Sequence, residues 1–165
     1  MKPVLEIAWR LVLSLWVGGI AIFTFLLTPA IFGHYGRDEA GRIVGVLFPL
    51  YFPYLSVLSL AALVLYALGC RGRRGAVHGA VLALLLLAVA GNAVNQFAIH
   101  PRSRAVKAEI HSFEAIPAEH PLRRRFARLH GVSMALNLFV LADGVLLLLL
   151  GPVGAGGSRE RRETG

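Results

Sequence analysis

The chain has 165 residues, of which 56% are hydrophobic, with a mean hydropathy of +0.67 and a formal net charge of +8. A soluble domain this apolar would lack the polar surface that water requires, so a soluble protein is excluded. The basic residues flank apolar stretches, where they anchor to lipid headgroups. They do not alternate with aromatic residues, so no nucleic-acid partner is expected.

Four apolar runs dominate the chain, and a helix needs about 20 apolar residues to cross a bilayer. In order, the runs are Leu11 to Phe32, Ile43 to Gly69, Ala76 to Ile99 and Val132 to Leu150. We therefore predict an all-α, integral membrane four-helix bundle over residues 1–150, with the bilayer as its environment. The first run is too long for a signal peptide, so we interpret it as a retained span. The Gly, Arg and Glu content of residues 151–165 predicts a disordered C-terminal tail.

A short amphipathic helix is predicted in the longest loop, between spans three and four. The third run meets His100 and Pro101, where we expect the span to stop. Val106, Ile110 and Phe113 then recur at helical spacing with basic residues off that stripe. This pattern is typical of a helix that lies on the membrane surface.

Polar side chains at membrane depth form two helical stripes toward the end of the molecule away from the termini. The first comprises Asn92, Asn95 and Gln96 on span three, and the second comprises His130, Ser133 and Asn137 on span four. Antiparallel packing brings the stripes to equal depth, and Thr28 and Tyr51 reach the same half. Because polar groups in hydrocarbon are costly and face the bundle interior, we predict one polar pocket there. Alternatively, these groups only hydrogen-bond helix to helix, at roughly 1 kcal/mol or less each.

A second polar group is predicted near the termini. Arg10 of span one and Asp143 of span four lie at comparable depths, so they are expected to neutralise each other as an intramembrane ion pair. The pair would fix the register of the two helices. A proton or ion path through the same residues is the alternative.

Two histidines are weak candidates for a metal or haem site. His100 and His130 lie where spans three and four meet the membrane surface, and two axial histidines on adjacent helices can hold a haem. No third Cys, Asp or Glu follows at a convincing spacing. No cofactor is therefore predicted, and no catalytic motif indicates an enzyme.

The topology and membrane follow from the distribution of charge. Basic residues are almost balanced between the two faces, but the tight basic turn at Arg71 and Arg74 favours termini on the inside. In a bacterium this would be the cytoplasmic membrane. Transport through four short spans would require a homo-oligomer.

Four motifs in order resemble a known family: LWVGGIAIFTFLLTPAIF, AGRIVGVLFPLYF, NAVNQFAIHP and FARLHGVSMALN. The family is that of the bacterial and eukaryotic four-helix membrane proteins typified by human transmembrane protein 205, and the resemblance covers Leu15 to Leu150. It implies four spans and no established activity. The positions matching its motifs are Gly41, Pro49, Tyr51, Asn95, Pro101, His130, Ser133 and Asn137.

Three functions are compatible with these features. The first is binding or transport of a small solute, lipid or ion through the polar pocket. The second is a haem- or metal-binding membrane redox protein with His130 and His100 as ligands. The third is an accessory or assembly subunit that packs against a larger membrane complex.

Overall fold

The computed structural model describes residues 3–71 and 74–150, which are helical with short connections and contain no strand. The elements are α1 Pro3–Ala21, η1 Ile22–Leu27, α2 Thr28–His34, α3 Arg37–Gly69, α4 Ala76–Val94, η2 Asn95–Ile99, α5 His100–Glu109 and α6 Pro121–Leu150. The elements labelled η are π-helical turns. The predicted tail, residues 151–165, lies outside the described residues.

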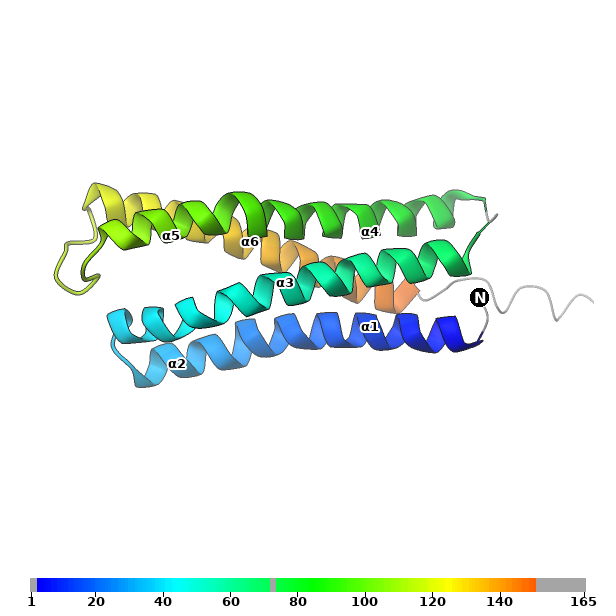
Figure 1. The fold of residues 1–165 in the computed structure, drawn as a ribbon, viewed down its shortest axis with the longest axis horizontal. Coiled ribbons are helices and arrows are strands. Elements are labelled where there is room, and N and C mark those ends of the chain that lie inside the picture. Colours follow the sequence, from blue (N-terminus) through cyan, green and yellow to red (C-terminus); the bar gives the residue numbers. More distant parts are fainter. Residues whose placement is uncertain (1–2, 72–73, 151–165) are drawn as a thin grey trace, which may run out of the picture.

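These elements join into four long antiparallel helices side by side, which confirms the all-α four-helix bundle (Figure 1). All four are long and apolar enough to cross a membrane: Pro3–His34, Arg37–Gly69, Ala76–Glu109 and Pro121–Leu150. At a rise of about 1.5 Å per residue they are about 45–51 Å long, against about 30 Å of hydrocarbon. The helix ends therefore extend beyond the apolar layer, and they carry the charged residues.

The core of the bundle is built from the inner stripe of each helix. On α1 the fully buried residues are Trp9, Leu13, Trp16 and Ile20, which recur every three or four positions. Large apolar residues between them stay exposed, as Leu11 does at 58%. An outer surface of this kind suits lipid, because lipid tails are as apolar as these side chains and no free energy is gained by burying them.

The expected end of span three at His100 and Pro101 is wrong. The predicted short helix is present as α5 and buries Val106, but it continues α4 along the same direction (Figure 1). Pro101 has no N–H, and its ring would collide with the carbonyl four residues earlier in a regular helix. The π-helical turn η2 just before it widens the helix at this point, so the chain passes the proline without a break. The helix ends at Glu109, which leaves Phe113 in the loop.

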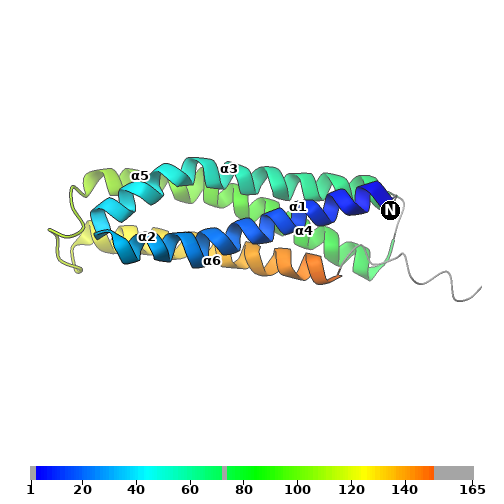
Figure 2. The same cartoon turned by 90° about the horizontal axis from the view of Figure 1, so that it is seen from below.

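The bundle opens toward the end that carries the loop between α5 and α6. In the half near the termini, α1 packs on α3 and α6, and α4 packs on α3 and α6. Beyond the two π-helical turns, α2 still packs on α3 and α5 still packs on α6. The backbones of α2 and α6, and of α3 and α5, no longer approach each other (Figures 1 and 2). Two helix pairs therefore face each other across a space at this end.

Candidate functional site

A cavity of about 770 Å³ fills the space between the two helix pairs. Residues of η1, α2 and α3 form one wall, and residues of α5, α6 and the loop before α6 form the other. The walls are largely aromatic: Phe23, Phe32, Phe48, Phe52, Phe113 and Phe126 line the cavity. The site is therefore a largely apolar space with polar groups at its two ends and along one wall.

The inner end of the cavity is a floor of three hydrogen-bonded side chains from three helices. The Tyr51 hydroxyl donates to Asn137 Oδ1 at 2.6 Å, and Asn137 Nδ2 donates to Thr24 Oγ1 at 2.9 Å. Tyr51 and Asn137 are both buried. The Tyr51 ring also stacks on Phe23, with ring centroids 4.1 Å apart. The polar groups of the floor thus satisfy one another.

The outer end is partly covered by the loop between α5 and α6. Asp38, in the first turn of α3, accepts hydrogen bonds from Ser112 Oγ at 2.6 Å and from the Phe113 amide at 2.7 Å. Arg123 of α6 donates to the carbonyls of Phe113 and Ile116 at 3.0 and 2.7 Å. These contacts tie the loop to both helix pairs.

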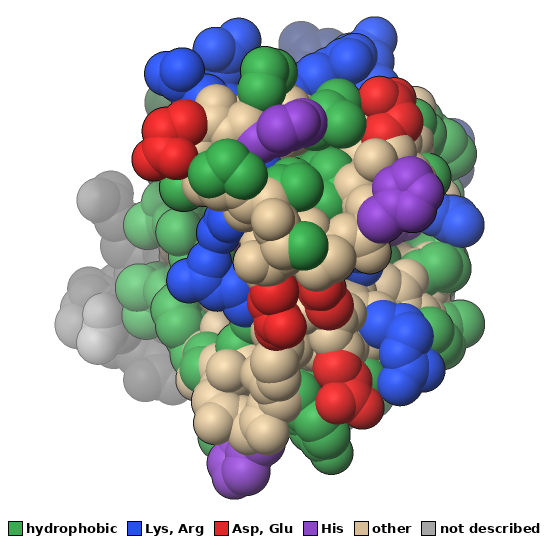
Figure 3. All heavy atoms as spheres, turned by 90° about the vertical axis from the view of Figure 1, so that its left-hand side faces the viewer, with side chains coloured by type: hydrophobic (Ala, Val, Ile, Leu, Met, Phe, Trp, Pro, Cys, Tyr) green, Lys and Arg blue, Asp and Glu red, His purple; other side chains and the backbone are tan. Residues whose placement is uncertain are grey.

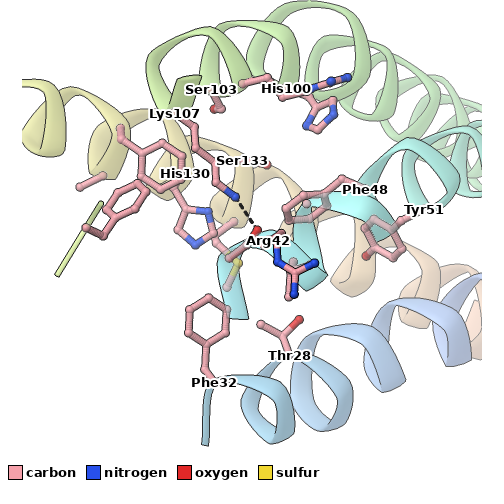
Figure 4. A pocket seen from close by; sticks show the side chains of 18 of the residues that line it. Thr28, Phe32, Arg42, Phe48, Tyr51, His100, Ser103, Lys107, His130 and Ser133 are labelled. Carbon is pink, nitrogen blue, oxygen red and sulfur yellow. Dashed lines mark hydrogen bonds between the residues drawn. The ribbon is translucent and has the colours of Figure 1, made fainter. Parts of the chain in front are cut away.

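One face of α5 presents four polar residues to the cavity: His100, Ser103, Arg104 and Lys107. Figure 4 shows three of them, His100, Ser103 and Lys107. They follow helical spacing, so they stack along a single wall. Lys107 spans the space and donates to the Gly41 carbonyl of α3. The His100 ring packs against Phe52, with centroids 4.9 Å apart. Its Nε2 and Ser103 Oγ are buried and have no hydrogen-bond partner in the described part of the chain.

The cavity is also strongly basic toward its mouth. The cations that line it are Arg37, Arg42, Arg104, Lys107 and Arg123, and no Asp or Glu is among the described residues that line it. Figure 3 looks onto this end, where charged side chains and histidines gather over the helix ends and the loop. The surplus of positive charge in the lining means that the mouth favours negatively charged groups.

Five of the eight residues predicted for the pocket line the cavity: Thr28, Tyr51, His130, Ser133 and Asn137. Thr28 Oγ1 donates to the Phe23 carbonyl at 2.8 Å, so its hydroxyl caps the π-helical turn. His130 stacks on Phe126 with centroids 6.0 Å apart. Whether any of them binds a ligand stays a prediction.

The three amides of span three lie outside the cavity and hold helices together. Gln96 accepts from Ser56 Oγ at 2.6 Å, and Asn92 donates to Ser59 Oγ at 3.1 Å. Asn95 faces α6, where its Oδ1 accepts from Ser133 Oγ at 2.7 Å. These three residues match the alternative expectation of helix-to-helix hydrogen bonds and not the expected stripe along one pocket.

The basic wall of the site escaped the sequence analysis. Its signal is present as His100, Ser103 and Lys107 at i, i+3 and i+7 around Pro101, but that segment was expected to leave the bundle. Ser56 and Ser59, which bind the amides of span three, were also missed. Serine is common in apolar helices, so the sequence alone does not distinguish these two serines from others.

The predicted ion pair between Arg10 and Asp143 does not form. Arg10 lies on the outer face of α1, beside the buried stripe, and its guanidinium donates to Glu6 at 2.8 Å. Asp143 is 2% exposed, and neither carboxylate oxygen has a hydrogen-bond partner among the described residues. Equal depth was therefore a poor guide, because the two side chains point in different directions from their helices.

Replacing Asp143 by asparagine is expected to raise the stability of the protein by about 1–3 kcal/mol, because it removes the cost of a buried carboxylate without a partner. The measurement is thermal unfolding in detergent. Arg10→Gln serves as the control and is expected to leave the melting temperature unchanged, since Arg10 is exposed. A drop in stability in both variants would instead indicate the ion pair.

His100 and His130 line the same cavity from α5 and α6. No three His, Cys, Asp or Glu side chains gather as a metal-ion site within residues 3–71 and 74–150. Ligation of a metal or haem by these two histidines stays an untested alternative.

The fold and the site define a class: a four-helix protein of multi-pass membrane type with a basic, aromatic cavity at one end. A family model described as a domain of unknown function, DUF4149, matches residues 11–112. An uncharacterized protein of Aquifex aeolicus (strain VF5) is 31% identical over 153 residues, which cover 93% of this chain and 95% of that protein. The chain therefore belongs to the DUF4149 family. No solved structure matches the chain.

Proposed function

We propose that this protein is an integral membrane protein that binds a small amphiphilic molecule in its end cavity, and that it is not an enzyme. The observation that carries the proposal is the apolar-walled cavity of about 770 Å³ at the end of the bundle. Ligand sites typically have about 300–1,000 Å³, are mainly apolar and contain a few convergent polar groups. The cavity has this size and this distribution of groups.

The shape of the cavity supports an elongated ligand. Arg123 and Asn137 both line it, and they lie about 21 Å apart along α6 at the rise of an α-helix. Between them the walls are aromatic. The polar floor supports the same conclusion, because Tyr51, Asn137 and Thr24 already satisfy one another and offer little to a polar ligand. A ligand with an apolar body and a polar head matches the cavity, whose walls are apolar and whose mouth is charged.

The position of the cavity supports access from one membrane face. Below the floor the bundle is packed with fully buried residues such as Trp16, Ile20 and Leu85. The cavity is therefore a one-sided site, and we favour binding over passage through the bundle. With the termini inside, the mouth would face the outer side of the membrane. A relationship to the proteins typified by human transmembrane protein 205 is part of the same proposal and rests on the shared motifs.

Photo-crosslinking in phosphatidylcholine vesicles tests the proposal. Three probes of equal chain length, each with a diazirine at mid-chain, carry a carboxylate, a hydroxyl or a trimethylammonium head. At least one is expected to label peptides that line the cavity. Labelling should fall about tenfold in Ala108→Trp and Ala127→Trp, because both residues line the cavity and a tryptophan at either position would obstruct it.

The matched controls are Ala105→Trp on α5 and Ala135→Trp on α6. Both are exposed, and neither lines the cavity, so labelling should be unchanged. Labelling only of outward-facing residues by all three probes, unaffected by the filling variants, would refute a ligand cavity.

A further inference from the structure

We propose that the ligand carries an anionic headgroup on a single acyl chain, and that α5 recognises the headgroup. This inference rests on the proposed function, because it requires that the cavity holds an amphiphile. The recognising residues are the stripe of α5 around Ser103, Arg104 and Lys107, with Arg42 of α3 opposite. The shared chemistry is a carboxylate or a phosphate monoester at the end of an alkyl chain.

The charges around the mouth are not balanced by acids of the protein. Asp38 attracts Lys107 electrostatically, but it does not line the cavity, and its two carboxylate oxygens accept from Ser112 and from the Phe113 amide. One carboxylate of this kind offsets only part of the charge of the five cations in the lining. Among the described ion pairs, only Arg42 of the cavity cations has a carboxylate partner. That partner, Glu39, lies 3.6 Å away, and both side chains are exposed, at 74% and 53%. The cations of the lining are therefore available to a ligand anion.

The donors of α5 are the best placed to receive that anion. Lys107 reaches from α5 toward the first turns of α3, near Arg42 (Figure 4). Its only described hydrogen bond is to the neutral Gly41 carbonyl. No hydrogen bond is described for Arg104, and the buried Ser103 Oγ has no hydrogen-bond partner within residues 3–71 and 74–150. A carboxylate or phosphate between these residues would form charge-assisted hydrogen bonds, which are about twice as strong as neutral ones.

The rest of the cavity indicates an alkyl chain behind the headgroup. Phe48 and Phe52 stack on each other with centroids 5.4 Å apart, and His100 packs against both of them. These rings lie deeper in the cavity than the basic residues of α5. A free inorganic anion would leave these apolar walls unfilled. One chain also agrees with a cavity of the size that takes a drug-sized molecule.

The same three photo-probes test this inference through their relative labelling. The carboxylate probe is expected to label the cavity at least about tenfold more than the trimethylammonium probe, with the alcohol between them. Lys107→Gln and Arg104→Gln should each lower carboxylate labelling several-fold and lower alcohol labelling much less. Arg102→Gln is the matched control, since Arg102 is an exposed arginine of α5 that does not line the cavity. It should have no effect.

Competition separates the sources of the anion. A single-chain phosphate monoester, such as lysophosphatidic acid, is expected to displace the carboxylate probe, and inorganic phosphate is not. Displacement by inorganic phosphate would overturn the inference in favour of a free-anion site.

Equal cavity labelling by all three heads would also overturn the inference but leave the proposed function standing. Absence of cavity labelling by every probe would instead remove the proposed function itself. An effect of Arg102→Gln as large as that of Arg104→Gln would overturn recognition by α5. It would show that the carboxylate probe is preferred only through general electrostatic attraction at the membrane surface.

Discussion

Replacing Gly144 by leucine is expected to destabilise the bundle by at least about 3 kcal/mol, which is the upper range for overpacking a core. A Cβ atom at this position would lie 2.8 Å from Val17 Cγ2 and 3.6 Å from Trp16 Cε2. Valine is stiff at χ1 and Trp16 is fully buried, so neither side chain can move aside. The remaining atoms of leucine would force α1 and α6 apart.

The measurement is the melting temperature in detergent, together with the yield of monodisperse protein. Gly131→Leu is the control on the same helix, because a Cβ there meets nothing within 4 Å. It should behave like the unmodified protein. If both variants unfolded at the same temperature, α1 and α6 would not be packed against each other as closely as described.

Replacing Asn137 by leucine is expected to cost about 2–4 kcal/mol, although the new side chain has a similar size. The substitution leaves the Tyr51 hydroxyl and Thr24 Oγ1 without their partner at the floor of the cavity. Each buried polar group left unsatisfied costs about 1–3 kcal/mol. Unfolding free energies of Asn137→Leu, measured in the same detergent, provide the test.

A double-mutant cycle makes this prediction specific. In the Tyr51→Phe background the hydroxyl is already absent, so Asn137→Leu should cost at least about 1 kcal/mol less than it does alone. Strictly additive effects of the two substitutions would show that Tyr51 and Asn137 are not coupled, and the floor would then not be a network.

The four-helix architecture was predictable because its signals are local. Runs of about 20 apolar residues and the breaks between them are visible without any tertiary information. The exact ends were not, because charged helix ends outside the hydrocarbon look like loops. This is why α5 was assigned to the membrane surface instead of to the third helix.

Contacts between helices were harder to predict than the helices themselves. Small residues allow helices in a membrane to pack closely, and the long helices contain Gly18, Gly19, Gly79, Gly91 and Gly131. A Cβ at Gly19 would meet the Tyr54 ring at 2.7 Å, and one at Gly91 would meet Val140 Cγ2 at 3.2 Å. At Gly18, Gly79 and Gly131 it would meet nothing within 4 Å. Spacing identifies a face of a helix, but it does not say which face meets a neighbour.

The two predicted polar stripes differ in their contacts for a related reason, since only the stripe of span four lines the cavity. His130, Ser133 and Asn137 lie on a regular α-helix, and all three line the cavity. Asn92 and Asn95 stand at the junction of α4 and the π-helical turn η2, where the helix changes its period. A wider turn alters the direction of the side chains that follow, so regular helical spacing could not predict which neighbour each amide faces.

The separation of the two helix pairs has a consequence for how the molecule fluctuates. Near the termini, all the helices are joined by a continuous apolar core. At the other end, the pairs are linked mainly through the floor, the packing of His100 on Phe48 and Phe52, the contact of Lys107 with Gly41 and the contacts of Asp38 with the loop. Regions with few buried apolar contacts open at lower free energy than the core, and their amides exchange hydrogen faster. A ligand that fills the cavity would supply the missing apolar contacts. It would therefore slow amide hydrogen exchange most in the half of the bundle that holds the cavity.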